Sequence, residues 1–457
     1  MSHDPRNCCH EHGRAARAGA GLPAVGRGMP DPAGTGLSRR SLLLRSAGLA
    51  LAVYGGGRLG GVGAFEEGVA RAAGGPAGSV LLSVFLDGGV DALSVLAPVG
   101  DADYRRLRPK LALRDGQGTP FAEDPRLAWH PAAGGLAGLH AEGKLTVLPA
   151  VGYAHPDQSH FTSRHFWEVG ALQTGLNTGW MGRLLDRIGT PDNPLQGVSL
   201  GGQLSPVLAA GTNPVAAVDD AADAGFWTPG TWSAPADGVV GTFTAIGRDH
   251  LRAGDPAVAQ AARAAAFAGT VSTALQPLGK DGKPVAPPPV AYPQSADDFP
   301  QRLAGFAAML AAGLPIRCAT ITAPGAYDTH ANQAATLPKH LQLTTDALVA
   351  FQRDLEARGL ADRVLTLVWS EFGRRAEEND SGTDHGAAGL GFLMGTRASG
   401  RMIGEFPGLA KLDEDGNVRA TSDFRGLYGA LAGDWFGVDP GAVLPDAAGI
   451  GRPVVLK

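Results

Sequence analysis

The chain has few cysteines, no excess of basic residues and no long apolar run, and each absence excludes a class of protein. Cys8 and Cys9 lie in the N-terminal leader, so the rest of the chain keeps Cys318 alone. One cysteine cannot form an internal disulfide. The formal net charge of −5 provides no basic surface, so we expect no nucleic-acid partner. No apolar run approaches the roughly 20 residues that a stable membrane span requires.

The remaining composition is that of a globular protein with many loops. Hydrophobic residues make up 44% and charged residues 18% of the 457 residues, which suits a substantial core. The 67 glycines and 33 prolines exceed ordinary usage and indicate a high loop content. The length allows one large domain with insertions, or two to three ordinary domains.

The N-terminus has the pattern of an export signal. Arg39 and Arg40 form a twin-arginine pair ahead of a short apolar stretch at residues 47–54. We therefore predict a signal peptide and flexible linker over residues 1–76, recognition by the twin-arginine export machinery, and a periplasmic or extracellular location. Residues 70–72 are one option for cleavage. The alternative is a buried amphipathic helix that carries paired arginines.

Strand-like and helix-like runs alternate through the rest of the chain. This order, with helices of crossover length between strands, predicts an α/β fold: a three-layer sandwich of helices around a mostly parallel sheet. We assign residues 77–457 to this domain and residues 205–298 to an insertion that forms a lid or cap. The predicted strands are residues 80–86, 145–151, 317–323 and 364–369, and the clearest helices are residues 299–310 and 337–358.

Short polar motifs recur where the apolar strand-like runs stop. The carboxyl ends of parallel strands share one edge of an open α/β sheet, and ligands bind there. We therefore expect the side chains of these motifs to converge in one crevice. The candidate metal ligands are Asp87, Asp91, Asp328, His330, Glu371, Asp384 and His385, and the candidate catalytic residues are Ser159 and His160.

Aspartate and histidine occur together in two of these motifs. Asp328 and His330 flank one threonine, and Asp384 and His385 are adjacent between two glycines. Carboxylate oxygen with imidazole nitrogen suits Zn, Mn or Fe, whereas a carboxylate-rich site suits harder cations. The alternative for Asp328 and His330 is structural, with a helix cap and a surface hydrogen bond.

The other three carboxylates also have two interpretations each. Glu371 follows a strand that ends in Leu-Val-Trp, where it is either a metal ligand or the partner of Arg374 in a structural pair. Asp87 stands at a strand end, as a ligand or a turn residue. Asp91 is either a ligand or the N-cap of residues 92–96.

Ser159 and His160 precede a segment, residues 161–169, that has a helical pattern. A serine at a helix N-terminus lies beside free backbone N–H groups and the positive end of the helix dipole. An anionic group such as phosphate or sulfate would be held there, and a metal would lower the pKa of the hydroxyl for attack. The alternative is simple N-capping by Ser159.

Together, and in this order, the motifs resemble the bacterial family called domain of unknown function 1501, an exported group linked to the alkaline phosphatase-like fold. The resemblance runs from about residue 80 to residue 438 and includes F-L-D-G-G-V-D-A-L, S-H-F, Y-D-T-H-A-N-Q, S-E-F-G-R and G-T-D-H-G. It implies a sheet between helices and a two-metal centre. It also implies Asp87 or Asp91 as the first acid, and Ser159 as the nucleophile.

We therefore predict an exported hydrolase that uses divalent metal ions (Zn, Mn, Ca or Mg) on a small-molecule or polymer ester of phosphate or sulfate. The alternative is a non-catalytic exported protein with the same fold and a cell-envelope or carbohydrate-binding role. A dinucleotide-dependent oxidoreductase is excluded, because D-G-G-V-D after the first strand lacks the G-x-G-x-x-G spacing.

Overall fold

The computed structural model describes residues 51–54 and 78–457, except residues 115, 223–235, 281–282 and 285. The predicted twin-arginine pair, Arg39 and Arg40, and the cleavage option at residues 70–72 lie outside the described residues. Within the described part of the chain, no helix has both the length and the apolar character needed to cross a membrane.

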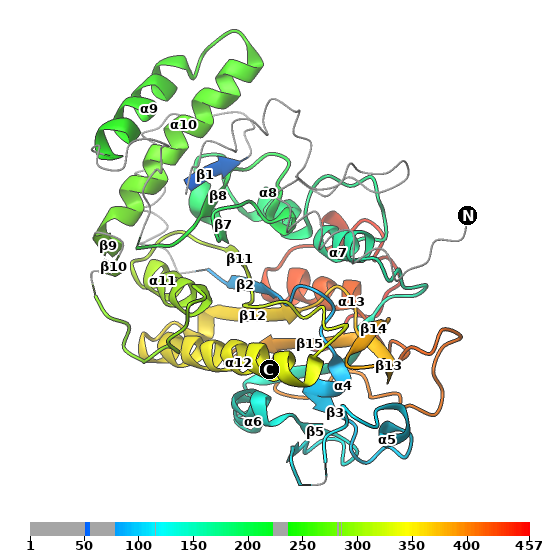
Figure 1. The fold of residues 1–457 in the computed structure, drawn as a ribbon. Helices are drawn as coiled ribbons and strands as arrows, with labels where there is room; N and C mark the ends of the chain where they lie inside the picture. The colour runs from blue at the N-terminus through cyan, green and yellow to red at the C-terminus, as the bar shows by residue number, and fades with distance from the viewer. Residues whose placement is uncertain (1–50, 55–77, 115, 223–235, 281–282, 285) are drawn as a thin grey trace.

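A nine-stranded mixed sheet forms the centre of the molecule (Figure 1). The neighbours from β8 to β12 pair in parallel, whereas β1 and β15 run antiparallel to their neighbours. In sheet order the strands are β1 (Leu51–Tyr54), β8 (Val215–Val218), β7 (Gly197–Leu200), β11 (Cys318–Thr322), β2 (Val80–Phe85), β12 (Val364–Trp369), β15 (Gly389–Met394), β6 (Leu145–Gly152) and β16 (Ser422–Asp423).

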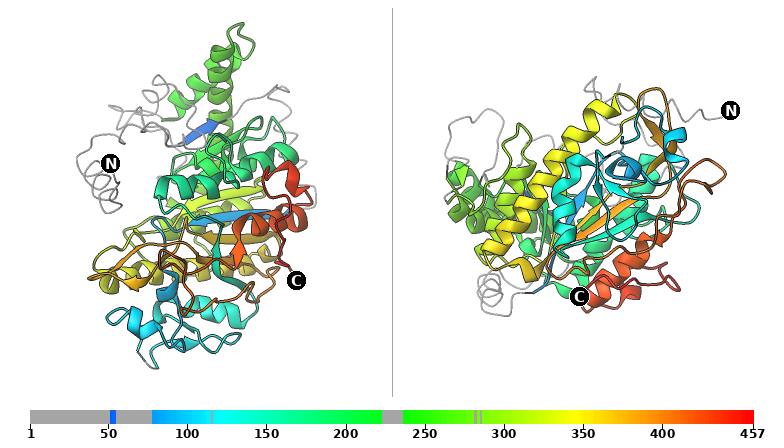
Figure 2. Two further views of the ribbon diagram at one scale, coloured as in Figure 1. Left: turned by 90° about the vertical axis from the view of Figure 1, so that its right-hand side faces the viewer. Right: turned by 90° about the horizontal axis from the view of Figure 1, so that it is seen from below.

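Helices cover both faces of this sheet (Figures 1 and 2). Successive side chains of a strand point to opposite faces, and in β2 Leu82 and Val84 join one apolar cluster while Leu81 and Phe85 join the other. The first cluster includes α6 (Gly134–Ala141), α11 (Phe299–Ala311) and α12 (Gln333–Ala357), and the second includes α7 (His160–Val169), α8 (Trp180–Ile188) and α13 (Phe424–Ala430). The predicted α/β fold class is confirmed.

The central strands have the sequences expected of strands buried on both faces. All six residues of β2 and all six of β12 are buried, and both sequences are almost entirely apolar. The structure starts α12 at Gln333, four residues before the predicted start. Residues 333–336 are Gln-Ala-Ala-Thr, and this first turn has no large apolar side chain for a periodicity to detect.

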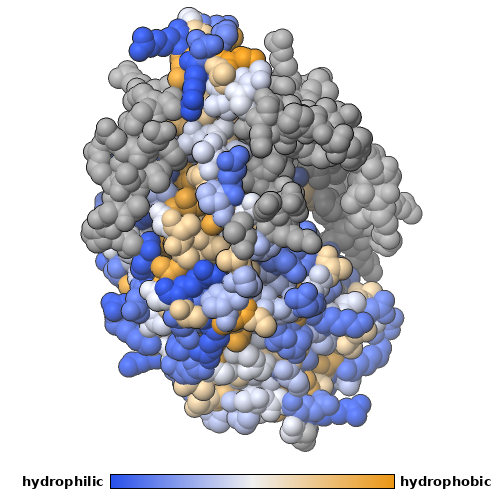
Figure 3. All heavy atoms as spheres, turned by 90° about the vertical axis from the view of Figure 1, so that its left-hand side faces the viewer, coloured by the Kyte–Doolittle hydropathy of each residue, from blue (hydrophilic) through white to orange (hydrophobic). Residues whose placement is uncertain are grey.

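The predicted insertion at residues 205–298 contains one strand of the central sheet as well as two long helices. Val215–Val218 (β8) pairs in parallel with β7, and Leu51–Tyr54 (β1), from the apolar stretch near the N-terminus, pairs antiparallel with β8. Helices α9 (Ala236–His250) and α10 (Pro256–Leu275) lie side by side and project beyond the sheet (Figures 1 and 2). Figure 3 shows hydrophilic and hydrophobic residues mixed on this side of the molecule.

The other elements are short. A hairpin of β13 (Arg374–Glu378) and β14 (Thr383–His385) follows β12 and carries part of the candidate site. The others are α4 (Ala92–Val95), β3 (Leu96–Ala97), α5 (Tyr104–Leu107), β4 (Thr119–Pro120), β5 (Ala128–Trp129), β9 (Gly279–Lys280) and β10 (Lys283–Pro284).

Candidate metal centre

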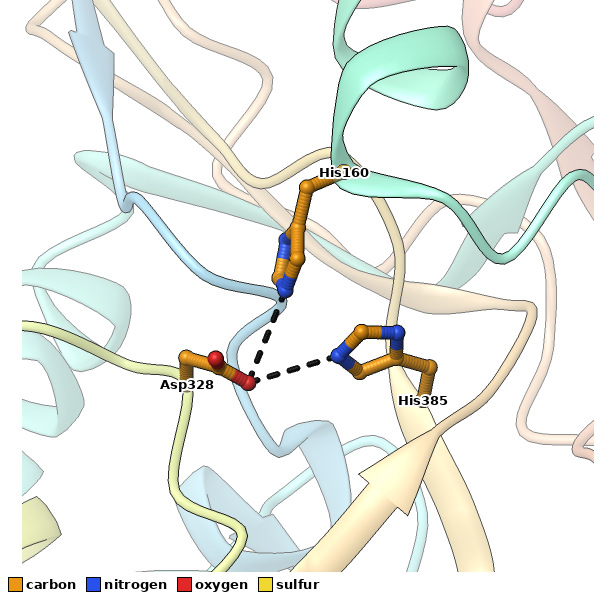
Figure 4. A group of neighbouring side chains, drawn as sticks. All are labelled: His160, Asp328 and His385. Atoms are coloured by element: carbon orange, nitrogen blue, oxygen red, sulfur yellow. Dashed lines mark hydrogen bonds and ion pairs between the residues drawn. The ribbon is translucent and has the colours of Figure 1, made fainter. Parts of the chain in front are cut away.

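Three neighbouring parallel strands deliver the polar motifs to one edge of the sheet. Phe85 of β2 is in register with Thr322 of β11 and with Trp369 of β12, so these three strands end side by side. The loops that follow carry Asp328 and Glu371. His160 enters the same region from the start of α7, and His385 enters from β14 (Figure 4).

Three histidines surround one carboxylate oxygen. The Oδ1 atom of Asp328 lies 3.1 Å from Nε2 of His330, 3.4 Å from Nε2 of His385 and 3.5 Å from Nε2 of His160. The Nε2 atoms of His330 and His385 are themselves 3.0 Å apart. Figure 4 shows Asp328, His160 and His385 with their polar ends directed toward one point. The ligand atoms of His160, Asp328 and His385 all lie within 4.8 Å of one another, a spacing that would suit a metal ion.

The other ring nitrogen of each histidine faces a hydrogen-bond acceptor. Nδ1 of His160 is 2.7 Å from Glu371 Oε1, and Nδ1 of His330 is 3.0 Å from Asp384 Oδ1. Nδ1 of His385 is 2.8 Å from the backbone carbonyl of Gln158. Because an ionised carboxylate and a carbonyl only accept hydrogen bonds, each Nδ1 carries a hydrogen. The Nε2 of a neutral ring then has a lone pair for a metal, whereas the Nε2 of a protonated ring has a hydrogen that it donates to Asp328 Oδ1.

This tautomer pattern favours a cation between the rings. Without a proton or a metal, the lone pairs of His330 and His385 would face each other at 3.0 Å. The three carboxylates of the centre, Asp328, Glu371 and Asp384, and the guanidinium of Arg374 leave a net charge of −2 when the histidines are neutral. A divalent cation balances that charge. Carboxylates or carbonyls that orient the far nitrogen of a histidine are also the usual outer partners of a metal site.

Arg374, which one of the two interpretations of Glu371 made its partner, contacts Asp328 instead. Its buried guanidinium donates to Asp328 Oδ1 at 2.5 Å and to the carbonyls of Gly89 at 2.7 Å and Thr383 at 2.8 Å, rather than to Glu371. Burial by itself would raise the pKa of Asp328. Hydrogen bonds from the three histidines and the charge of Arg374 outweigh it and lower that pKa, so the carboxylate stays ionised.

Glu371 lies behind His160. Its side chain is 0% exposed, and its carboxylate accepts hydrogen bonds from the backbone N–H groups of Gly88 and Gly89, each at 3.0 Å, as well as from His160. Burial raises the pKa of Glu371, but these bonds and the charge of His160 lower it overall. The structure therefore places Glu371 as the residue that orients His160.

The two glycines of the D-G-G motif are required by this contact. Gly88 and Gly89 have φ values of +113° and +70°, in the left-handed region that disfavours other residues. A Cβ atom on Gly89 would lie 2.2 Å from the ring of Phe372, and one on Gly88 would lie 2.4 Å from the backbone nitrogen of Asp328. The motif thus presents two N–H groups to Glu371 at close range.

The first two aspartates each form an ion pair with an arginine. Asp87 is 51% exposed, and its carboxylate is 3.8 Å from the guanidinium of Arg164. Asp91 is fully buried in an ion pair with Arg108 and also accepts hydrogen bonds from Ser94 and Gln333. Asp91 is the N-cap residue of α4, but its side chain makes no capping hydrogen bond. Its contacts are those of a structural ion pair.

Ser159 is the N-cap residue of α7 by backbone geometry, directly before His160. Its side chain makes no capping hydrogen bond, and its N–H donates to Asp157 Oδ1 at 2.7 Å. Capping therefore does not occupy the hydroxyl. The role of Ser159 as nucleophile stays a prediction.

Two further groups support the centre without a signal in the sequence. The carbonyl of Gln158 accepts from His385, and a backbone carbonyl has no residue-type signature. The hydroxyl of Ser163 donates to the backbone carbonyl of Glu371 at 2.5 Å and so holds α7 against that loop. For Arg374 the sequence did give a signal, because this residue belongs to the S-E-F-G-R motif. Among the described residues, one group of histidines and acidic residues has the spacing of metal ligands, and it consists of His160, Asp328 and His385.

Replacing Glu371 with Gln should weaken metal binding roughly 10- to 100-fold, although Asp328 and the three histidines around its Oδ1 atom remain in place. The substitution removes the negative charge that stabilises the Nδ1–H of His160 and the ring orientation it sets. Competition with a chromogenic chelator measures the affinity. Glu377→Gln, an exposed carboxamide substitution on β13, is the matched control. An unchanged affinity in Glu371→Gln would show that Glu371 does not orient a ligand.

Part of the chain is similar to a known protein family. Residues 259–446 match the family described as "Protein of unknown function (DUF1501)". This segment contains five of the predicted metal-site residues, namely Asp328, His330, Glu371, Asp384 and His385. A search of curated proteins finds no match.

Several solved structures are similar at low identity. The C-terminal periplasmic domain of EcEptC from Escherichia coli, in complex with Zn, is 10% identical, with 84% of this chain and 93% of that chain covered and a TM-score of 0.34. The PsFucS1 sulfatase from Pseudoalteromonas sp. is 12% identical, with 82% and 71% covered and a TM-score of 0.31. The lipoteichoic acid synthase LtaP from Listeria monocytogenes is 7% identical, with 84% and 79% covered and a TM-score of 0.30. The family match thus shows a similarity to DUF1501 over residues 259–446.

Proposed function

We propose that this chain is an exported, metal-dependent hydrolase that acts on phosphate or sulfate esters. The observation that supports it is the group of three histidine Nε2 atoms around Asp328 Oδ1, each ring held by an acceptor at Nδ1. Export by the twin-arginine machinery to the periplasm or beyond is part of the same proposal, and it rests on the N-terminal sequence.

The residues that would hold the metal are Asp328, His160, His330 and His385. Three imidazoles and one carboxylate suit Zn, Mn or Fe, whereas Ca and Mg prefer sites made of oxygen ligands. When bound, such a metal acts as a Lewis acid on an ester oxygen and lowers the pKa of a coordinated hydroxyl. Asp328 and His330 are 29% and 34% exposed, so solutes can reach the centre.

The start of α7 supplies the other elements of an ester-hydrolysing site. Ser159 offers a hydroxyl next to His160, and the first backbone N–H groups of the ten-residue helix have no partner within the helix. These groups and the positive end of the helix dipole favour an anionic group, such as the phosphate or sulfate of an ester. In this proposal the Ser159 hydroxyl attacks the phosphorus or sulfur atom, the ester bond to the alcohol breaks, and the serine proton ends on the departing alcohol. Water then hydrolyses the serine ester, which releases phosphate or sulfate and restores the hydroxyl.

Replacing Ser159 with Ala should abolish ester hydrolysis while sparing metal content. The panel contains p-nitrophenyl phosphate, bis(p-nitrophenyl) phosphate and p-nitrophenyl sulfate, and metal is measured by mass spectrometry on the same preparations. Thr162→Ala, on the same turn of α7, is the control and should leave turnover unchanged. Equal turnover in Ser159→Ala and the wild type would exclude Ser159 as the nucleophile.

One observation favours the non-catalytic alternative. His330 lies beside the three residues with metal-ligand spacing, His160, Asp328 and His385. If it also coordinates, the metal has four protein ligands, as structural zinc sites do, whereas catalytic sites keep a position open. In that case the wild type would bind metal and lose stability when it is removed, yet hydrolyse no member of the panel. The cell-envelope or carbohydrate-binding role would then be the better proposal.

A further inference from the structure

Gln333, the first residue of α12, has a fully hydrogen-bonded side-chain amide in the interior of the protein. The residue is 1% exposed. Its Oε1 atom accepts hydrogen bonds from the hydroxyls of Thr329, at 2.9 Å, and Thr383, at 2.7 Å. Both threonines are buried as well. The two lone pairs of the amide oxygen are therefore used by hydroxyls from two separate segments of the chain.

Both threonines belong to segments that carry residues of the candidate metal centre. Thr329 is the middle residue of D-T-H at residues 328–330, and Thr383 is the first residue of β14, whose sequence is T-D-H. The backbone joins the two segments at the same place, because the N–H of Thr383 donates to the carbonyl of Thr329 at 3.1 Å. The two threonines thus form a junction between the D-T-H segment and β14.

The other end of the amide is held by the segment that follows β2. Nε2 of Gln333 donates to the carboxylate of Asp91 and, at 3.1 Å, to the hydroxyl of Ser94. The carboxylate of Asp91 is paired with Arg108 and only accepts hydrogen bonds, so Nε2 faces Asp91 and Oε1 faces the two hydroxyls. This contact needs an oxygen at position 91 but not its charge.

The backbone at the start of α12 also contacts the hairpin of β13 and β14. Asn332 has a φ of +56°, a left-handed conformation that asparagine adopts more readily than most residues. The N–H of Gln333 donates to the carbonyl of Ser381 at 2.9 Å, in the turn between the two strands. The first turn of the helix is therefore held against the hairpin by its backbone, and a change of the Gln333 side chain leaves that contact in place.

We propose that Gln333 is a positioning residue of the metal centre. Its amide oxygen holds the D-T-H segment and β14 at a fixed separation, and each segment carries one of the histidines His330 and His385, whose Nε2 atoms are 3.0 Å apart. Metal sites need ligands held to within about 0.5 Å, and hydrogen bonds behind the ligands supply that precision. The inference rests on the metal centre of the proposed function, but it does not depend on Ser159 or on hydrolysis.

The test compares Gln333→Met with Gln352→Met in the full chain. Both glutamines are 1% exposed and belong to α12, but Gln352 bonds Glu356 and lies about 28 Å further along the helix. Methionine keeps the length of the side chain and loses its hydrogen bonds. Gln333→Met should weaken Zn binding roughly 10- to 100-fold in competition with a chromogenic chelator. Gln352→Met should keep the wild-type affinity even where urea titration shows a lower free energy of unfolding.

A second pair of variants separates the position of the ligands from stability. Thr383→Val removes one hydroxyl that bonds Oε1, whereas Thr383→Ser keeps it. The valine variant should weaken Zn binding roughly two- to tenfold, the equivalent of one hydrogen bond, and the serine variant should retain the wild-type affinity. The visible absorption spectrum of the Co-loaded protein reports the geometry of the ligands, and it should change in Gln333→Met and Thr383→Val but not in Gln352→Met or Thr383→Ser.

Wild-type Zn affinity together with an unchanged Co spectrum in Gln333→Met would overturn the inference while leaving the metal centre intact. Equal effects of serine and valine at position 383 would overturn it as well, and this pair decides the matter if Gln333→Met does not fold. A wild type that binds neither Zn nor Co would instead overturn the metal centre of the proposed function, and the role of Gln333 with it.

Discussion

Replacing Asp328 with Asn is expected to abolish metal binding and to lower the free energy of unfolding by about 2 kcal/mol. Asp328 Oδ1 is the atom that all three Nε2 atoms and the guanidinium of Arg374 surround. The amide keeps the shape but loses the charge, so Arg374, which is fully buried, is left without its carboxylate. Partial exposure of Asp328, at 29%, keeps the expected loss below that of a fully buried pair.

Mass spectrometry of the purified variant measures metal content, and urea titration measures the free energy of unfolding. Asp87→Asn is the matched control, because Asp87 belongs to the same strand-end edge but is 51% exposed and contacts Arg164 rather than the histidines. It should retain both metal and stability. Wild-type metal content in Asp328→Asn would show that the centre is not a metal site.

Replacing Asp91 with Asn is expected to cost about 3 kcal/mol of stability while leaving metal content unchanged. Both side chains of the Asp91–Arg108 pair are 0% exposed, so the variant leaves a buried guanidinium without its counter-charge. The Asp91→Asn/Arg108→Gln double variant removes both charges and should recover part of the loss. Loss of metal without loss of stability would instead make Asp91 a ligand, as the sequence allowed.

The same pair predicts how stability depends on pH. Burial would raise the pKa of Asp91, but the charge and hydrogen bonds of Arg108 lower it overall. A carboxyl whose folded-state pKa is below its unfolded value, about 3.9, contributes stability that is fully present above that pH. This contribution is lost as the pH falls toward the folded-state pKa. Urea titrations at pH 7 and below pH 4 should therefore show a smaller acid-dependent loss in Asp91→Asn than in the wild type.

The elements with strong local patterns were predictable, and those with weak patterns were not. The strand Val364–Trp369 has the predicted bounds, because six buried residues in a parallel strand leave a continuous apolar run. The strands Gly197–Leu200 and Val215–Val218 are four residues long and rich in small side chains. They gave no such signal, and β8 was placed within an insertion.

The candidate site shows the same division at the level of side chains. The motifs marked Glu371 and Asp384 as carboxylates near strand ends, but a ligand and the partner of a ligand have the same residue types. The structure puts Glu371 against Nδ1 of His160 and Asp384 against Nδ1 of His330. It also brings His160 into the group around Asp328, where the sequence suggested a catalytic role.

The sequence by itself determined the α/β class and the set of polar residues that follow the central strands, because both features depend on patterns among a few neighbouring residues. Tertiary structure alone decided which nitrogen of each histidine faces inward, which carboxylate Arg374 contacts, and that Asp91 pairs with Arg108. Those choices depend on contacts between distant positions, such as Gly88 with Glu371, 283 residues apart, and His160 with Glu371, 211 residues apart. Such contacts are set by how the strands pack, and no local spacing encodes them.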